Sequence, residues 1–101
     1  MKYRVDNASG EARVHISGAL SFKDHQEFRQ MVDEVMAMKP GKVAVDMAEL
    51  ASVDSAGLGL LVILNSRMKQ AGATFKLCRA NEAVARLLSI VQFEKLCTIE
   101  P

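Results

Sequence analysis

Aromatic residues, proline and cysteine are scarce in this 101-residue sequence, and its charges nearly cancel. There is no tryptophan, and the one tyrosine and four phenylalanines are too few and too scattered to form a platform on which nucleic-acid bases stack. Thirteen basic and twelve acidic side chains leave a formal charge of +1, without the basic footprint that binding to a phosphate backbone requires. We therefore expect no direct contact with nucleic acid.

Long apolar runs and paired cysteines are also missing. The longest unbroken apolar run, Leu60 to Leu64, is far shorter than the roughly 20 residues of a membrane-spanning helix. The first eleven residues contain no apolar signal segment, so we expect a cytoplasmic protein without membrane insertion. Cys78 and Cys97 lack the spacing of metal ligands, and we expect two reduced, buried thiols.

The length fits one domain over residues 1–101, and a composition that is half apolar can build a core. Apolar stretches with branched residues predict strands over 13–17, 42–47 and 74–78, with edge strands over 1–5 and 97–99. The segment Asn-Ala-Ser-Gly-Glu predicts a hairpin turn near the amino terminus. Helical periodicity separates the other strands, which favours parallel pairing. The predicted class is α/β, with a mixed sheet of four to five strands flanked by helices.

Three helices are expected, and each has a recognisable start or end. The first should run over 23–38, with Ser21 as its cap, and the third should follow Asn81, a good capping residue. One face of the third helix carries Val84, Leu87, Leu88 and Val91. The second helix, over 56–71, begins in the stretch Val-Asp-Ser-Ala-Gly-Leu-Gly-Leu-Leu, where each glycine costs roughly 1 kcal/mol of helix stability relative to alanine.

The second helix has two apolar lines instead of one. The line expected to lie on the sheet contains Gly57, Leu60, Leu61, Leu64, Met68 and Ala71. A second line, about 130° away by helical geometry, contains Leu58, Val62, Asn65 and Lys69. Because Gly57 and Gly59 remove side-chain bulk at the same end of the helix, another backbone can approach closely there. The pattern favours a partner that docks across the start of this helix.

Ser55 has two interpretations. A serine before a helix is a preferred cap whose oxygen accepts a hydrogen bond from a free amide, worth about 1 kcal/mol. Alternatively, Ser55 is a phosphorylation site, because a helix amino terminus stabilises a phosphate through its free amides and its dipole. A phosphate would add nearly two negative charges beside Leu58, Val62 and Asp54. Burying that charge in an interface is costly, so phosphorylation would release a partner.

Catalytic and metal chemistry fit the sequence poorly. A serine-hydrolase elbow needs a glycine two residues before the serine, where this chain has Val53, and nothing brings His15 or His25 to Ser55. The phosphate-binding loop motif is missing its lysine. Asp46 and Asp54 suggest magnesium ligands, but isolated carboxylates at strand ends are more typical of turns. We expect no catalytic residue, no metal and no cofactor.

The stretch Val-Ala-Val-Asp-Met-Ala-Glu-Leu-Ala-Ser-Val-Asp-Ser-Ala-Gly-Leu-Gly-Leu-Leu resembles the signature of STAS domains, the module shared by anti-sigma-factor antagonists and sulphate transporters. Val-His-Ile-Ser-Gly-Ala-Leu-Ser-Phe resembles the Gly-x-Leu element of the family's second strand. The segment from Asn81 to Ile99 resembles its closing helix and strand. The resemblance covers nearly the whole chain and implies the STAS fold, a mixed sheet flanked by helices.

The antagonist branch of the family implies a non-enzymatic binding protein. Its unphosphorylated form would sequester a serine-kinase anti-sigma factor, and a PP2C-type phosphatase would reset it after phosphorylation. Ser55 matches the phosphoacceptor, Asp54 precedes it, and Gly57 and Leu58 continue the motif. Ser21 stands where many antagonists carry Asp, and the nearest acid is Asp24. The expected partner-binding residues are Ser21, Asp54, Ser55, Gly57, Leu58 and Val62.

The same resemblance leaves other partners open. Some STAS proteins are constitutive accessory subunits of membrane transport complexes of the ABC type, and others pair with response regulators. The second apolar line of the middle helix could also close a homodimer. The oligomeric expectation is a monomer or a weak homodimer.

Overall fold

A β-hairpin opens the fold in the computed structural model, which describes residues 1–101. Strand β1 (Lys2–Ala8) pairs antiparallel with β2 (Glu11–Leu20). Ser9 and Gly10 connect them with φ angles of 54° and 80°. Two central residues with positive φ match the right-handed twist of a hairpin, and glycine and small polar residues adopt this conformation most readily. The expected hairpin is confirmed.

The remaining strands extend this hairpin into one five-stranded sheet in the order β1-β2-β3-β4-β5. Strands β3 (Lys42–Val53), β4 (Thr74–Cys78) and β5 (Thr98–Glu100) each pair in parallel with the preceding strand. The predicted mixed sheet is therefore confirmed, with β1 and β5 as its edges. β3 runs six residues beyond its predicted end, because irregular register with β2 lets pairing continue to Val53.

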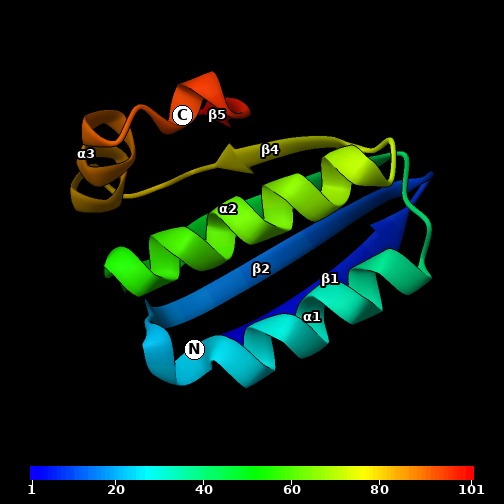
Figure 1. The fold of residues 1–101 in the computed structure, drawn as a ribbon, viewed down its shortest axis with the longest axis horizontal. Coiled ribbons are helices and arrows are strands. Elements are labelled where there is room, and N and C mark those ends of the chain that lie inside the picture. The colour runs from blue at the N-terminus through cyan, green and yellow to red at the C-terminus, as the bar shows by residue number, and fades with distance from the viewer.

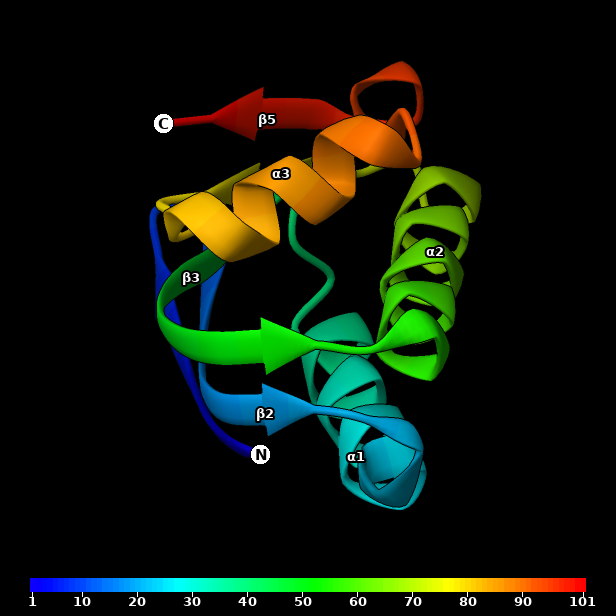
Figure 2. The ribbon, with the colours of Figure 1, turned by 90° about the vertical axis from the view of Figure 1, so that its left-hand side faces the viewer.

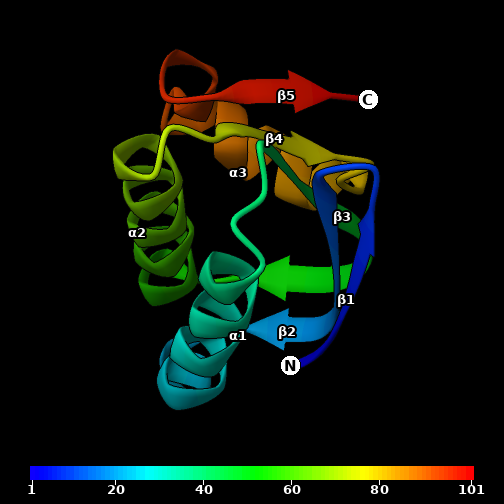
Figure 3. The same ribbon diagram turned by 90° about the vertical axis from the view of Figure 1, so that its right-hand side faces the viewer.

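Helices α1 (His25–Ala37) and α2 (Ser55–Gln70) lie side by side against the sheet (Figures 1 and 3). Helix α3 (Glu82–Ile90) lies across the bent, carboxyl-terminal part of β3 (Figure 2). There the Asn81 side chain donates to the carbonyl oxygen of Leu50 at 3.0 Å. None of the helices combines the length and apolarity needed to cross a membrane.

Alternating residues along the strands build the core. On one face of the sheet, Val14, Val45 and Leu77 lie side by side in register, and all three are fully buried. Helix α1 adds Phe28, Met31, Val32 and Val35 to the same core cluster, and α2 adds Leu60, Leu61, Leu64 and Met68. The apolar line of α2 that was predicted to face the sheet is therefore confirmed, apart from Ala71, which is exposed beyond the end of α2.

The two predicted caps, Ser21 and Asn81, both occupy N-cap positions in the structure. The Asn81 side chain accepts a hydrogen bond from the Val84 amide at 2.8 Å, so this predicted cap is confirmed, although Val91 at the other end is exposed. Ser21 is the N-cap residue of the first helical segment, as predicted, although that segment begins as a 3-10 turn and becomes an α-helix only at His25. A short 3-10 turn, Phe22–Asp24, precedes α1, and the Ser21 amide and hydroxyl both donate to the Asp24 carboxylate, at 2.8 and 3.2 Å.

Candidate functional site

The start of α2 is organised by Asp54, the residue that follows β3. Asp54 has extended backbone angles, and its carboxylate accepts a hydrogen bond from the Gly57 amide at 2.7 Å. Asp54 is therefore the cap, and the interpretation of Ser55 as the cap is wrong. The physical reason is that aspartate caps as well as serine does, and Asp54 is the last residue with non-helical backbone. Ser55 is the first helical residue, and its exposed hydroxyl has no hydrogen-bond partner.

Gly57 is needed for a contact inside the chain. A Cβ at this position would lie 2.4 Å from the carbonyl oxygen of Leu20 and 3.0 Å from Cγ1 of Val53. The same Leu20 oxygen accepts a hydrogen bond from the Asp54 amide at 3.2 Å. The backbone that approaches Gly57 is thus the end of β2, and the idea that this glycine accommodates a partner's backbone is wrong. Gly59 is exposed with open space around it.

This contact between β2 and α2 brings the expected site residues into one region. Ser21 directly follows Leu20, so it lies at the strand end that receives Asp54 and Gly57. Ser21 is half-buried and held by Asp24, whose carboxylate also accepts from the Met1 amino group at 2.7 Å. Hydrogen bonds from that amino group and from Ser21 outweigh burial and lower the pKa of Asp24. Asp24 is therefore an ionised anchor for the turn before α1.

The second line of α2 is only partly a free surface. Leu58 is half-buried and packs against the core, whereas Val62 is 40% exposed. Asn65, further along the line, is buried, and its side-chain oxygen has no hydrogen-bond partner. Lys69 is exposed at the end of the line. Val62 and part of Leu58 are thus the apolar side chains of this line that a partner can reach.

Sequence reasoning missed two exposed apolar side chains near the start of α2. Phe22 is 75% exposed in the turn after Ser21, and Ile63 is 50% exposed on α2. Both line a hollow with His25, Ala56 and Gly59. A signal existed for Phe22, because a large aromatic in the polar stretch Ser-Phe-Lys-Asp-His has no periodic partners. At 100° per residue, Ile63 lies outside both apolar lines of α2, on the opposite side of the sheet-facing line from Leu58 and Val62.

The remaining polar candidates lie elsewhere. Asp46 is buried in the middle of β3, where it forms ion pairs with Arg79 and Arg13, and His15 lies between Asp6 and Asp46. Asp46 is thus neither at a strand end nor in a turn. No hydrogen bond joins His15 or His25 to Ser55. No group of three or more His, Cys, Asp or Glu side chains is placed to hold a metal ion.

The two cysteines differ in burial. Both are free, as expected, but only Cys78 is buried, and Cys97 is half-buried. Burial raises the pKa of both thiols, and it raises the pKa of Cys97 to about 11.

A mixed sheet with one antiparallel edge strand, β1, and a capped helix α2 directly after its central strand, β3, define a small α/β module. Comparison with known proteins assigns its family. The family model described as "Mlab, STAS domain" matches residues 3–99. A STAS-domain containing protein of Pseudomonas aeruginosa (strain UCBPP-PA14) is 32% identical over 89 residues, which cover 88% of this chain and 87% of that protein. The chain belongs to the STAS domain family.

Solved structures share this fold. An anti-sigma factor antagonist from Mycobacterium paratuberculosis superimposes with a TM-score of 0.87 at 19% identity, covering 99% of this chain and 85% of that one. The anti-sigma factor antagonist SpoIIAA in its unphosphorylated form gives 0.76 at 13% identity, covering 97% and 87%. A sulfate transporter family protein from Wolinella succinogenes gives 0.79 at 14% identity, covering 92% and 78%.

Proposed function

We propose that this chain is an anti-sigma-factor antagonist that works by partner switching. In its unphosphorylated form it binds a serine-kinase anti-sigma factor, and phosphorylation of Ser55 releases that partner. The observation that carries the proposal is the free, exposed Ser55 hydroxyl at the first position of α2, beside a cap that Asp54 already provides. The likeness to anti-sigma factor antagonists, one of them solved in its unphosphorylated form, supports it.

The start of α2 has room for a phosphate without unfolding. The first four amides of a helix lack intrahelical acceptors unless a cap supplies them. Here the Gly57 amide donates to the Asp54 side chain, and the Leu58 amide donates to the Asp54 carbonyl at 2.9 Å. The amides of Ser55 and Ala56 have no such acceptor, so they and the helix dipole can stabilise an anion at this end. The modification therefore changes the surface while the fold persists.

Release follows from the surroundings of Ser55. Ser21, Asp54, Leu58 and Val62 lie around the start of α2, and Gly57 contributes by holding the helix against β2. A partner that covers this surface buries a neutral serine in the unphosphorylated form. A phosphate would place nearly two negative charges in the interface beside the Asp54 carboxylate and the apolar Val62. Desolvation of an unpaired dianion then favours separation.

Partner switching of this kind defines the partners of the chain and the compartment in which it acts. The bound partner is a serine-kinase anti-sigma factor, and a PP2C-type phosphatase resets the chain by removing the phosphate. Such a pair acts in the cytoplasm and requires no cofactor or metal in this chain. The chain itself supplies a binding surface and a phosphoacceptor, and it works as a monomer or a weak homodimer.

The proposal is tested first by mapping phosphorylation on the protein isolated from its own cells, during growth and under stress. We expect phosphate on Ser55 whose occupancy changes with condition. In parallel, pull-down of the native kinase is compared for Ser55→Asp and for Ser66→Asp, which places the same charge on an exposed position of α2. We expect loss of binding only with Ser55→Asp. An unmodified Ser55 under every condition, together with unchanged binding by Ser55→Asp, contradicts the switch.

A second candidate function is the role of a constitutive accessory subunit in an ABC-type membrane transport complex. The likeness to a sulfate transporter family protein favours it, because the same fold occurs in a transport context. This role predicts that the untagged protein copurifies with a transport ATPase, whether Ser55 is serine or aspartate. Copurification with a kinase that is lost in Ser55→Asp favours the antagonist instead.

A further inference from the structure

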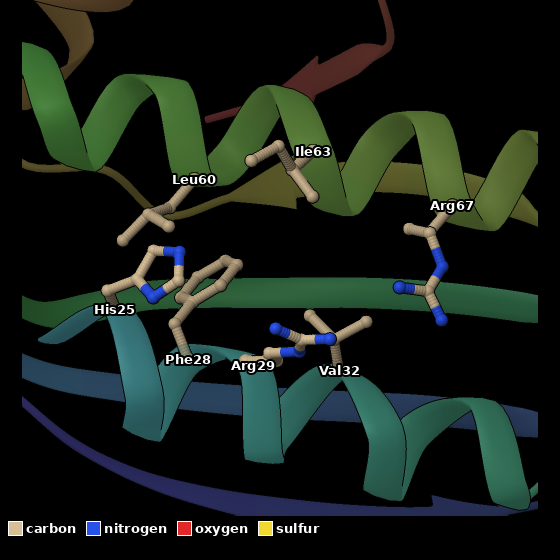
Figure 4. A pocket seen from close by; sticks show the side chains of 7 residues that line it. All are labelled: His25, Phe28, Arg29, Val32, Leu60, Ile63 and Arg67. Atoms are coloured by element: carbon tan, nitrogen blue, oxygen red, sulfur yellow. The ribbon is translucent and has the colours of Figure 1, made fainter.

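Helices α1 and α2 are separated on their outer side by a groove that the site residues above do not occupy (Figure 4). The groove has a volume of about 200 Å³. Its buried apolar walls are Phe28 and Val32 on α1 and Leu60 on α2, and the half-exposed Ile63 stands at its mouth. An apolar groove between two helices is the usual form of site for an apolar side chain or a helix of another protein.

The charges along this groove are of one sign and unpaired. Arg29 on α1 and Arg67 on α2 both extend along it (Figure 4). Arg67 is half-buried, yet neither arginine has an ion pair or a side-chain hydrogen bond. Asp33, one turn after Arg29, forms no ion pair with it. By contrast, each of the other four arginines pairs with a carboxylate: Arg4, Arg13, Arg79 and Arg86.

The groove is continuous with a hollow that reaches Ala56, the residue after Ser55. Leu60, Ile63 and His25 line both the groove and the neighbouring hollow, which also contains Ala56 and Gly59. Phe22, at 75% exposure, forms the outer wall of that hollow. A partner that covers Ser55 can therefore extend across Ala56 and Phe22 into the groove. Each hollow is too small to bury a lipid chain, because ligand pockets usually measure roughly 300–1,000 Å³.

We propose that this groove binds an acidic, apolar segment of the partner protein. An apolar side chain of the segment enters between Phe28 and Ile63. Carboxylates beside it pair with Arg29 and Arg67, since guanidinium groups bind carboxylates in a planar, two-bonded geometry. Arg29 and Arg67 thus select the partner by charge. The inference rests on the proposed function, because the same partner covers Ser55 and the groove.

The test uses a photo-crosslinking amino acid, p-benzoylphenylalanine, in place of the exposed Phe22 in the full chain, inside the cells that produce it. Adducts are digested and the crosslinked partner peptide is sequenced. We expect a peptide with apolar residues flanked by Asp or Glu. The double variant Arg29→Glu with Arg67→Glu should lower the adduct yield at least tenfold. The matched control, Arg4→Glu with Arg86→Glu, makes the same charge change at exposed positions away from the groove and should leave the yield unchanged.

The identified peptide is then synthesised, and its binding to the purified chain is measured by fluorescence anisotropy at low and high salt. We expect weaker binding at high salt and at least tenfold weaker binding to the groove variant. An adduct with a lipid, with a second copy of this chain, or with a peptide that lacks acidic residues overturns the inference. No protein adduct in growing and stressed cells, or an adduct insensitive to the charge reversal, also overturns it. Urea unfolding of each variant confirms that the fold is intact.

Failure of this inference is distinguishable from failure of the switch at Ser55. Adduct loss in the groove variant but not in Ser55→Asp supports the groove and contradicts the switch. Adduct loss in Ser55→Asp but not in the groove variant supports the switch and contradicts the groove. If both variants lose the adduct, one partner covers both regions.

Discussion

The carbonyl oxygen of Leu20 lies against Gly57, so close that a Cβ on the glycine would be 2.4 Å away. This contact joins the end of β2 to the first turn of α2 and places Ser21 beside the helix that begins with Ser55. Since the obstacle is backbone, it cannot rotate away as a side chain would. The exposed face of the candidate site therefore depends on an internal glycine.

Gly57→Ala should destabilise the fold although alanine is the better helix former. We expect a loss of about 1–3 kcal/mol in unfolding free energy, because overpacking against Leu20 exceeds the gain in helix propensity. Gly59→Ala is the matched control, since nothing lies within 4 Å of its Cβ position, and it should gain up to about 1 kcal/mol. Urea unfolding measures both. Equal effects of the two substitutions would show that the Leu20 contact is unimportant.

Removing the capping side chain of Asp54 should lower the unfolding free energy more than removing the Ser55 hydroxyl does. Asp54→Ala loses the hydrogen bond to the Gly57 amide, and we expect a loss of about 1 kcal/mol in unfolding free energy. Asp54→Asn keeps an acceptor and should stay close to the parent. Ser55→Ala should change stability by less than about 0.5 kcal/mol, because its side chain has no partner. Thermal unfolding of the three variants decides which residue caps α2. A larger loss of stability in Ser55→Ala than in Asp54→Ala would show that Ser55 is the cap.

Asp46 should make the unfolding free energy of the protein fall at acid pH. Burial alone raises the pKa of Asp46, but hydrogen bonds from Arg79 and the Ala48 amide, together with the Arg13 charge, outweigh burial and lower the pKa to about 2. In the unfolded chain the pKa of aspartate is about 3.9. Because the folded value is the lower one, the stabilisation is complete above about pH 4 and is lost as pH falls toward 2.

An arginine substitution isolates this effect from other carboxylates, such as Asp24. The difference in unfolding free energy between the parent and Arg79→Met should be largest near pH 6 and should shrink as pH falls to 2. Arg86→Met, which removes an exposed arginine from a pair on α3, should give a small difference that changes little with pH. Urea unfolding at a series of pH values provides the measurement. A parent-to-variant difference that does not change with pH would contradict the assigned role of the pair.

The thiols should be unreactive in the folded protein. Burial raises the pKa of Cys97 to about 11, and Cys78 is buried with its pKa raised in the same direction. Because the thiolate is the reactive form, we expect alkylation of Cys97 by iodoacetamide at pH 8 to be about 100-fold slower than for a free thiol. Alkylation of Cys78 should also be slower than for a free thiol. Unfolding in urea should restore the ordinary rate at both positions. Mass spectrometry of the time course tests this, and rapid labelling of native Cys97 would show that it is more accessible than its half-burial indicates.

Much of the fold was predictable because its signals are local. The hairpin turn, the strand over 74–78, the Asn81 cap and the sheet-facing line of α2 each depend on neighbours within one or two turns of chain. Helix periodicity and turn chemistry act over the same short range. The motif around Ser55 can also be recognised from the order of its residues alone, and the family match over residues 3–99 agrees with that assignment.

Relations between distant segments required the tertiary structure. The sequence by itself determined the elements, their faces and the exposed serine at the start of α2. Only the folded chain decided that Gly57 faces Leu20, that Leu58 is partly core, and that Asp46 pairs with Arg79 inside β3. It also placed the unpaired Arg29 and Arg67 along one groove. Local propensities act within a few residues, whereas these contacts join residues 33 or more positions apart. The energies of these contacts also depend on burial, which exists only after the chain has folded.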